Sequence, residues 1–225
     1  MDYIISLGGS IIVPDNISIN FLVKFKTLIC KRVKNGDRFI IVTGGGRTSR
    51  NYQIAGRALG VLKREDLDWL GIYSSRLNAH LLQVMFGDYV FSKVLTNPTH
   101  VNNWNTGILI VGGWKPGWST DYVAVCLAKA FNINNVLNLS NIDYVYDKNP
   151  KEHADAKPLK RISWKDFRAL IGSKWDPGLH TPFDPIASIL AENLSLKVII
   201  LRGTNLQNLS KLFNGKTFKG SLIHD

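Results

Sequence analysis

The chain has 225 residues, of which 45% are hydrophobic and 20% are charged, with 19 Gly, 8 Pro and only 2 Cys. This composition excludes a disordered chain, a collagen-like chain and a miniprotein held together by disulfides. The 28 Lys and Arg residues outnumber the 17 Asp and Glu residues and give a net charge of +11, which favours an anionic partner without identifying it.

Five short apolar runs alternate with helical patterns along the chain. The runs are rich in Ile and Val and are apolar on both faces, as the buried strands of a parallel sheet are. They span residues 3–7, 39–42, 108–111, 136–139 and 198–201. Apolar residues at helical spacing predict helices near residues 22–33, 124–131 and 186–194. The last of these follows Asp184 as an N-cap, with Pro185 in the first turn. The alternation predicts an α/β fold, with helices on both faces of a mostly parallel sheet.

The length and the start of the chain bound its organisation. A chain of this size can bury one large core, so we expect a single domain with two lobes. The first residues lack a basic region followed by an apolar stretch, and no window holds the ~18 apolar residues of a membrane span. We therefore expect a soluble cytoplasmic protein with no membrane partner.

Two segments interrupt the alternation. Residues 147–168 are polar and basic, and Pro150 and Pro158 prevent a continuous helix there. Ser163 and Asp166 have the spacing of a capping box, which predicts a helix at about residues 164–172. The basic stretch is either a solvated surface excursion or a flap that faces a nucleotide. Residues 173–183 have no periodicity and either close over a site or form a contact between lobes.

Glycines follow three of the predicted strands directly, at residues 8–9, 44–46 and 112–113. Glycine lets backbone N–H groups approach an anion closely, and a following helix N-terminus adds partial positive charge. The carboxyl ends of parallel strands share one edge of a sheet, so the three turns are expected to converge there, with Arg47 and Arg50 beside them. The sequence contains neither G-x-x-x-x-G-K-[ST] nor a G-x-G-x-x-G that opens a helix, so phosphates would be bound without either loop.

Six segments, in order, resemble the amino acid kinase superfamily and, within it, the UMP kinases of the archaeal type. They are ISLGGS at residues 5–10, TGGGR at 43–47, DWLGI with RLNA at 68–79, GGWKPGWSTD at 112–121, SNIDYVYDKNP at 140–150 and DPIA at 184–187. The resemblance covers nearly the whole chain and implies a three-layer αβα sandwich. It further implies an acceptor-binding lobe at about residues 1–132 and an ATP-binding lobe at about residues 133–225.

The activity that the resemblance implies is ATP + UMP → ADP + UDP, with Mg²⁺, in pyrimidine nucleotide biosynthesis. The implied UMP-binding residues are Gly44, Asp68, Trp114, Lys115, Pro116, Gly117, Trp118, Ser119 and Thr120. The implied ATP-binding residues are Gly9, Ser10, Gly45, Arg50, Ser140, Asn141, Tyr146 and Asn149. Asp121, Arg47 and Arg50 are the catalytic candidates, and no residue is assigned to a metal. Such a transfer needs positioning and charge neutralisation rather than a general base, because the nucleophile is already an anionic oxygen.

Several residues depart from the family pattern. Ser6 and Ile189 stand where superfamily kinases often carry Lys, which leaves Arg47, Arg50, Lys115, Mg²⁺ or the basic stretch to supply the positive charge. Trp114 and Trp118 replace a Thr and a His that are common in the family. Their indoles can stack on a pyrimidine, reshape the pocket or pack against a neighbouring subunit. Asn149 replaces an Asp.

Other readings of the sequence stay open. By the same resemblance the protein is expected to be a homo-oligomer, a hexamer. One alternative is a small-molecule phosphate kinase similar to isopentenyl phosphate kinase, which the absence of His from residues 48–52 disfavours. Another is a non-catalytic nucleotide- or anion-binding protein on the same fold. Nucleic acid is not expected as a partner, because only the net charge favours it.

Overall fold

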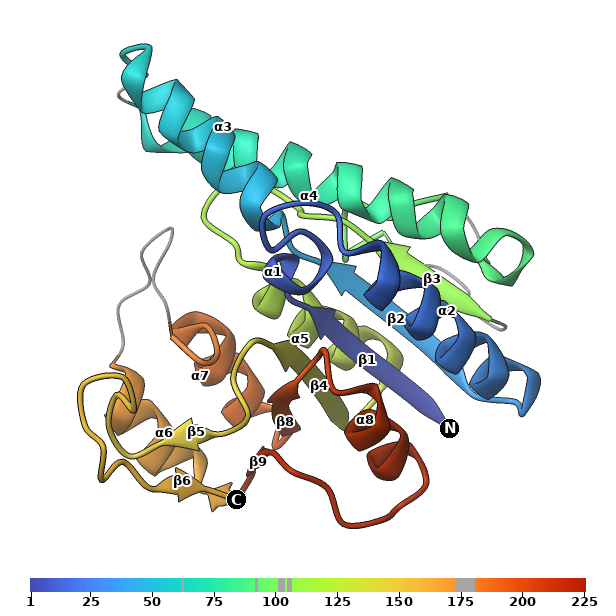
Figure 1. Ribbon diagram of the computed structural model, residues 1–225, viewed down its shortest axis with the longest axis vertical. Coiled ribbons are helices and arrows are strands. Elements are labelled where there is room, and N and C mark those ends of the chain that lie inside the picture. Colours follow the sequence, from blue (N-terminus) through green and yellow to red (C-terminus); the bar gives the residue numbers. More distant parts are fainter. Residues whose placement is uncertain (62, 92, 101–103, 105–106, 173–180) are drawn as a thin grey trace.

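A central sheet organises the part of the chain that the structure describes, which is residues 1–61, 63–91, 93–100, 104, 107–172 and 181–225. In this computed structural model the sheet has seven strands among the described residues, in the order β3-β2-β1-β4-β8-β9-β7 (Figure 1). The strands are β1 (Asp2–Leu7), β2 (Arg38–Thr43), β3 (Ile108–Val111), β4 (Asn135–Ser140), β7 (Arg161–Ile162), β8 (Lys197–Arg202) and β9 (Ser221–Ile223). The five predicted strands fall within β1, β2, β3, β4 and β8, so their prediction is confirmed.

The sheet is mostly parallel. β1 pairs in parallel with both β2 and β4. The pairs β2–β3 and β4–β8 are also parallel. Only the pairing of β8 with β9 is antiparallel within this sheet, among the strands described. Side chains of β1 alternate between two cores: Ile4 belongs to one and Ile5 to the other. Strands buried on both faces explain why the sequence shows continuous apolar runs there.

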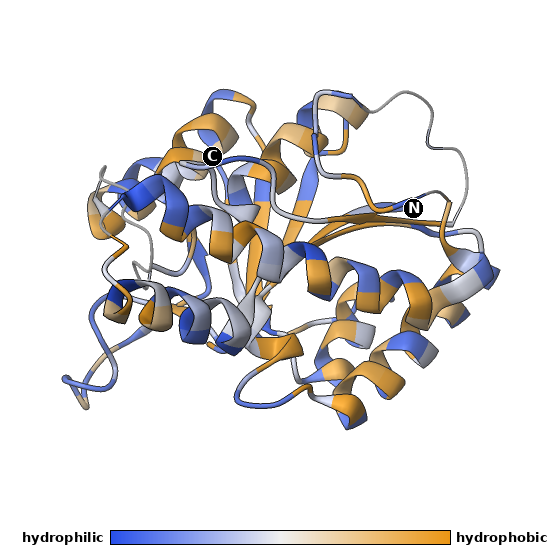
Figure 2. Cartoon of the chain, turned by 90° about the horizontal axis from the view of Figure 1, so that it is seen from above, coloured by the Kyte–Doolittle hydropathy of each residue, from blue (hydrophilic) through white to orange (hydrophobic). Residues whose placement is uncertain are grey.

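Helices cover both faces of the sheet. α2 (Ile19–Lys34), α4 (Arg64–Phe86) and α8 (Leu206–Phe213) contribute to the core on one face. α5 (Thr120–Phe131), α6 (Trp164–Ile171) and α7 (Pro185–Asn193) contribute to the core on the other. The short α1 (Gly9–Ile12) and the longer α3 (Gly46–Ala58) follow the first two strands, and a 3-10 turn (Gly87–Tyr89) follows α4. Figure 2 shows apolar strands between helices that alternate apolar and polar residues. The predicted three-layer αβα architecture is confirmed.

Side chains that were expected to start helices do so. The Ser163 hydroxyl accepts a hydrogen bond from the Asp166 amide at 3.1 Å and donates to its carboxylate at 2.7 Å. Asp184 caps α7 by accepting from the Ala187 amide at 2.6 Å, with Pro185 in the first turn. Both predicted helix starts are therefore confirmed.

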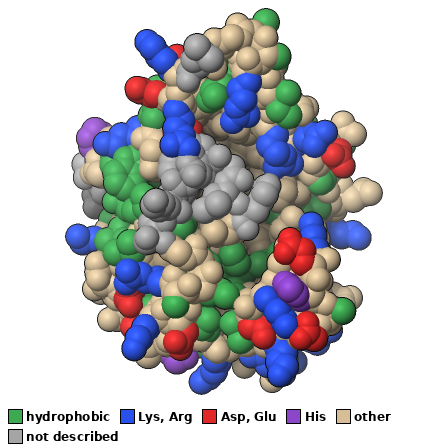
Figure 3. Space-filling view, turned by 90° about the vertical axis from the view of Figure 1, so that its left-hand side faces the viewer, with side chains coloured by type: hydrophobic (Ala, Val, Ile, Leu, Met, Phe, Trp, Pro, Cys, Tyr) green, Lys and Arg blue, Asp and Glu red, His purple; other side chains and the backbone are tan. Residues whose placement is uncertain are grey.

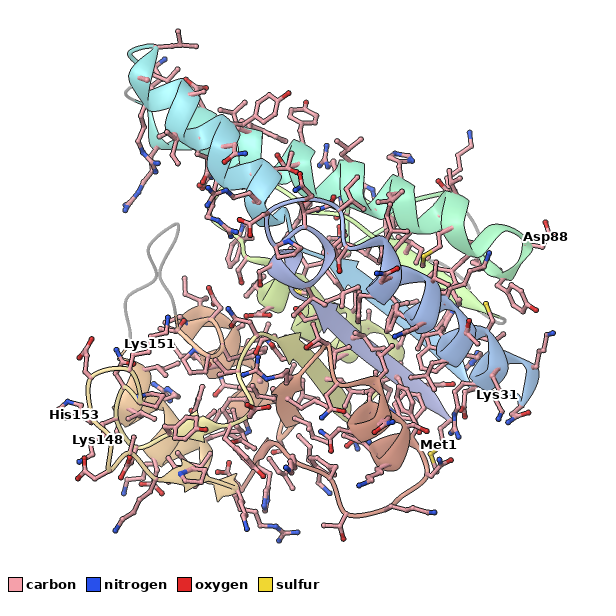
Figure 4. All side chains as sticks on the ribbon, in the orientation of Figure 1. Met1, Lys31, Asp88, Lys148, Lys151 and His153 are labelled. Carbon is pink, nitrogen blue, oxygen red and sulfur yellow. The ribbon has the colours of Figure 1, made fainter. Side chains whose placement is uncertain are left out.

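The first part of the basic stretch lies outside the main sheet. β5 (Val145–Tyr146), just before the stretch, and β6 (Pro158–Leu159) make a separate antiparallel pair, whereas β7 and α6 later in the stretch belong to the main sheet and its core. Lys148, Lys151 and His153 lie on the connection between β5 and β6, on the outer side of the molecule, away from Met1 and Lys31 at the other end of the sheet (Figure 4). The predicted closing segment at residues 173–183 lies largely outside the described residues. Across the described residues, no helix combines the length and apolar content that crossing a membrane requires.

The carboxyl ends of the central strands point to the same side of the molecule, toward the tip of α3 and toward α7 (Figure 1). Figure 3 views this side directly and shows Lys and Arg side chains spread over both its upper and lower halves. This edge is where the turns that follow β1, β2 and β3 begin.

Candidate active site

The turns after β1 and β2 pack backbone against backbone. The Gly8 amide donates to the Leu139 carbonyl at 2.9 Å, and the Gly44 amide donates to the Leu7 carbonyl at 3.0 Å. A Cβ atom on Gly9 would overlap the backbone of Gly46, and one on Gly44 would overlap the backbone of Gly9. Only glycine permits this approach. The predicted convergence of these two turns is confirmed.

The two merged turns present a helix N-terminus. α3 has 13 residues, and its first residue is Gly46 at φ +64°. No side chain caps this helix, since Gly45 stands at the N-cap. The Arg47 amide of the first turn donates to the Val13 carbonyl at 2.9 Å, and the partial positive charge of the helix N-terminus favours an anion beside it. The Arg47 side chain is exposed, and that of Arg50, at the start of the second turn, is half-buried. The predicted phosphate-binding residues Gly9, Gly45 and Arg50 therefore gather around one helix start.

The glycines after β3 let helix α4 pack close to the turn. The Gly112 amide donates to the Leu95 carbonyl at 2.9 Å, and the Gly113 amide donates to the Ser75 hydroxyl at 2.8 Å. A Cβ atom on Gly113 would lie 2.7 Å from that hydroxyl oxygen. Both N–H groups are thus used within the protein, as those of Gly8 and Gly44 are, and the absence of side chains lets α4 approach. The interpretation of residues 112–113 as an anion-binding turn stays a prediction.

Helix α4 connects the second and third turns. The Asn78 side chain donates to the Gly44 carbonyl at 2.8 Å, while Ser75 accepts from Gly113. The Thr43 hydroxyl, at the end of β2, donates to the Ser75 carbonyl at 2.9 Å. Asn78 and Ser75 are buried. One face of a single helix therefore fixes the spacing between the two loops.

Asp68 and residues 114–120, named here the acceptor loop, border an open cavity. The Gly117 amide donates to the Asp68 carboxylate at 3.1 Å. Burial raises the pKa of the Asp68 carboxyl, and this hydrogen bond opposes the rise. The cavity has a volume of about 640 Å³ and is lined by Arg64, Glu65, Asp68, Trp69, Lys115, Pro116, Gly117 and Trp118. The structure thus brings Asp68 together with four of the predicted acceptor residues.

The aromatic side chains of the acceptor loop form a row. The ring centroids of Trp114 and Trp118 are 6.1 Å apart at an interplanar angle of 26°, and Trp118 stacks on Tyr122 at 4.0 Å. The Lys115 ammonium lies 4.4 Å from the centroid of the Trp114 ring. Tyr122, which the sequence did not single out, follows Asp121 in the first turn of α5. The row presents aromatic surface beside a cation, a combination that suits a nucleobase next to a phosphate.

Asp121 is partly buried beneath the loops. Its carboxylate accepts hydrogen bonds from the Ser6 hydroxyl at 2.8 Å, the Asn138 side-chain amide at 3.0 Å and the Asp184 backbone amide at 3.2 Å. Burial raises the pKa of the Asp121 carboxyl to about 6. All three donors are neutral. Because they come from β1, β4 and the N-cap of α7, the carboxylate links these three elements to the start of α5. This geometry suits a support for the loops, whereas the resemblance had made Asp121 a catalytic candidate.

Two helix caps meet beside Asp121. The Ser119 hydroxyl accepts from the Tyr122 amide at 3.1 Å and caps α5. The same hydroxyl hydrogen-bonds the Asp184 carboxylate, which caps α7. Burial raises the pKa of Asp184 as well, against the opposing effect of these hydrogen bonds. The last residues of the acceptor loop are therefore tied to the C-terminal part of the chain.

The predicted ATP-binding residues after β4 are arranged less compactly. Ser140 ends β4, and a Cβ atom on Gly8 would lie 3.8 Å from its Cα atom, so Ser140 adjoins the first glycine turn. Tyr146 packs edge-on against Tyr144 at 6.4 Å. Asn149 is exposed and donates to Glu152 at 2.6 Å within the outer connection. The structure therefore places Ser140 with Gly9 and Ser10, whereas Asn149 lies in a turn of its own.

The sequence pattern missed an ion pair at this edge. Arg202, the last residue of β8, donates to both carboxylate oxygens of Asp143 at 2.8 and 2.9 Å. The Arg202 guanidinium holds the pKa of the Asp143 carboxyl below its ordinary value. The pair fastens the segment after β4 to β8. Within the described ranges, no group of three or more Asp, Glu, His or Cys side chains could hold a metal ion.

Comparison with known proteins gives consistent results for family and fold. The model of the amino acid kinase family matches residues 2–202. The uridylate kinase of Sulfurisphaera tokodaii is 33% identical over 227 aligned positions, which cover 99% of both chains. That of Methanocaldococcus jannaschii is 35% identical, with coverage of 98% of this chain and 100% of the relative. The crystal structure of the uridylate kinase from Archaeoglobus fulgidus superposes with a TM-score of 0.82 at 27% identity, over 99% of this chain and 100% of that one.

Proposed function

We propose that this chain, which belongs to the amino acid kinase family, is a uridylate kinase that transfers the γ-phosphoryl group of ATP to UMP and releases ADP and UDP. The full-length similarity to proteins named uridylate kinases supports this substrate pair. The observation that carries the proposal is the open cavity between Asp68 and the acceptor loop. Gly71, about one turn further along α4, adjoins Gly45 at the start of α3.

On the acceptor side, Asp68 would accept hydrogen bonds from the ribose hydroxyls of UMP. A carboxylate has about four lone-pair sites, so Asp68 can hold two hydroxyls and keep the Gly117 amide. The Trp114 and Trp118 indoles would contact the uracil ring, and Gly44 with Lys115 would face the phosphate. Pro116, Ser119 and Thr120 would complete the loop around the nucleotide.

On the ATP side, Gly9, Ser10 and Gly45 would surround the transferred phosphoryl group, with Arg47 and Arg50 neutralising its charge. Ser140, Asn141, Tyr146 and Asn149 would hold the rest of ATP. Mg²⁺ would enter with the phosphates of ATP and neutralise charge on the transferred group. Catalysis would then consist of aligning two nucleotides, with Asp121 holding the loops that do so. With an acceptor lobe at about residues 1–132 and an ATP lobe at about residues 133–225, the phosphates of ATP would reach from the ATP lobe to the glycine turns of the acceptor lobe.

The outer face of α4 supports a homo-oligomer. Tyr73, Leu77 and Val84 are spaced by four and seven residues and are 61%, 63% and 80% exposed. Large apolar side chains in such a row are typical of a surface that a second copy covers. Light scattering of the purified protein measures the assembly, for which the hexamer remains our prediction. The cytoplasm, where both nucleotides occur, is the compartment that the proposal implies.

A coupled assay of ADP release with Mg-ATP tests the activity. The acceptors are UMP, CMP, AMP and isopentenyl phosphate, and UMP is expected to give the highest kcat/KM. Turnover of isopentenyl phosphate alone would favour the alternative phosphate kinase. Absence of turnover with every nucleotide would refute the proposal.

Asp68→Ala tests the assignment of the acceptor site. The variant is expected to raise the KM for UMP at least about tenfold, since hydrogen bonds to a charged group are lost, while the KM for ATP stays nearly constant. Asp66→Ala is the matched control, because Asp66 is an exposed carboxylate on the same helix. An equal loss of affinity for both nucleotides would show that Asp68 is structural.

One observation favours a second candidate, a non-catalytic nucleotide-binding protein. The partly buried Asp121 contacts only neutral donors among the described residues, with Ser6 at the position where superfamily kinases often carry Lys. Calorimetry that detects ATP and UMP binding without turnover would support this candidate.

A further inference from the structure

Arg76 on α4 hydrogen-bonds to the backbone at the start of the acceptor loop. Its Nε atom donates to the Gly113 carbonyl at 3.0 Å, and its Nη2 atom donates to the Trp114 carbonyl at 2.7 Å. The two donors belong to one planar guanidinium, so they fix two successive carbonyls relative to each other. None of the binding roles described above involves this side chain.

The guanidinium is oriented by its own helix. It lies 5.7 Å from the centroid of the Trp69 ring and 5.5 Å from that of Tyr73, two residues on the same face of α4. Such cation–π contacts limit the directions in which the guanidinium can point. A Cβ atom on Gly112 would lie 2.8 Å from the Arg76 Cγ atom, so glycine at this position is what lets the side chain reach the loop. The two hydrogen bonds from Arg76 to the loop are therefore formed without a ligand.

We propose that Arg76 is the positioning residue of the acceptor loop, an inference that rests on the proposed function. The carbonyl that it holds belongs to Trp114, whose indole begins the aromatic row and lies under the Lys115 ammonium. By fixing the peptide between Trp114 and Lys115, Arg76 sets both the aromatic surface and the cation that face the acceptor nucleotide. Arg76 acts through the loop and makes no contact with the substrate itself.

The inference is testable because a guanidinium that binds two carbonyls in a fixed geometry differs from a group that supplies only a positive charge. Lys carries the same charge as Arg but has a single nitrogen, which cannot bind two successive carbonyls in a fixed geometry. A residue that only attracts the acceptor phosphate would tolerate Lys. A residue that positions the loop would not.

The experiment compares Arg76→Ala and Arg76→Lys with wild type. Arg57→Ala is the control, because Arg57 is an exposed arginine at the end of α3. Both Arg76 variants are expected to raise the KM for UMP about tenfold, with the KM for ATP within about twofold of wild type. Added guanidinium ion is expected to lower the KM for UMP of Arg76→Ala, and ammonium ion is not. The near-ultraviolet circular dichroism of the stacked aromatics is expected to fall in Arg76→Ala, while the far-ultraviolet spectrum stays unchanged.

Three results would overturn the inference. They are wild-type kinetics in Arg76→Lys, a parallel rise of both KM values in Arg76→Ala, and an unchanged near-ultraviolet spectrum in Arg76→Ala. Failure of the wild-type protein to phosphorylate UMP would instead refute the proposed function. In that case the near-ultraviolet spectra and the guanidinium rescue of that signal still decide whether Arg76 holds the loop.

Discussion

The acceptor loop and the segment after β4, residues 141–159, both leave the same edge of the sheet, yet they are anchored in different ways. The acceptor loop is held from outside itself: α4 contributes Asp68 and Arg76, and α7 contributes Asp184 through Ser119. The segment after β4 is anchored at its two ends, where Arg202 pairs with Asp143 and the Ser221 hydroxyl of β9 accepts from the buried Val145 amide and donates to the Leu159 carbonyl. The outer connection between these ends, residues 147–157, is stabilised mainly from within.

The internal contacts of that segment lie near its surface. Lys148 donates to Asp155 at 2.6 Å, and the Lys157 amide donates to Asp147 at 2.8 Å. The flanking Lys151 and His153 lie on the outer side of the molecule (Figure 4). Surface contacts of this kind contribute little free energy, because water and salt screen them. The difference teaches that the acceptor loop is anchored along its length by other elements, whereas the outer connection after β4 depends on weaker, local contacts.

The largest expected effect comes from filling the space between the acceptor loop and α4. In Gly113→Ala the new methyl group would lie 2.7 Å from the Ser75 hydroxyl and 3.3 Å from the Ile72 Cα atom. We expect a loss of about 2 kcal/mol in the free energy of unfolding, measured in urea, because the loop or the helix must shift. The same substitution at Gly117 meets no atom within 4 Å but has φ +84°, so it isolates the cost of backbone strain, about 1 kcal/mol. Equal losses at the two positions would contradict close packing on α4.

A smaller effect is expected from the charge of Asp121. Its pKa is about 6 in the folded protein and 3.8 in the unfolded chain, so the folded state binds the proton more tightly. The stability that protonation adds is fully present below pH 3.8 and is lost as the pH rises through 6. Between pH 7.5 and pH 5 the wild type should therefore gain about 1 kcal/mol relative to Asp121→Asn, as measured by denaturant unfolding at both pH values. A difference between the two proteins that does not change with pH would show that Asp121 does not titrate in this range.

The sequence predicted the fold well because a strand that is buried on both faces shows as a continuous apolar run in the sequence. The run at residues 136–139 lies inside β4, and the run at 198–201 lies inside β8. β5, β6 and β7 have two residues each and β9 has three, too few to show a period. Ser163 and Asp184 were found because a cap and its helix are neighbours in the sequence.

The site was predicted less completely, because its contacts join residues that are far apart in the sequence. Ser6 and Asp121 are 115 residues apart, and Arg76 is 38 residues from Trp114. Glycines after a strand look the same whether another turn or a helix approaches them. The turn after β2 packs on the turn after β1, while Gly113 lies against Ser75, and only the structure separates the two cases.

The smallest expected effect lies in the outer connection of the segment after β4. It tests how weakly that connection is anchored compared with the acceptor loop. Asp155→Ala removes the partner of Lys148 and leaves the cation in place; the two side chains are 77% and 37% exposed. If the segment is held by many weak surface contacts, the free energy of unfolding should fall by no more than about 0.5 kcal/mol, and the difference should shrink in high salt. Urea unfolding at low and high salt measures both quantities, and the KM for UMP should stay at the wild-type value. A loss as large as that of Gly113→Ala would mean that the two regions are anchored alike, because a single exposed pair cannot carry that much energy unless the whole segment depends on it.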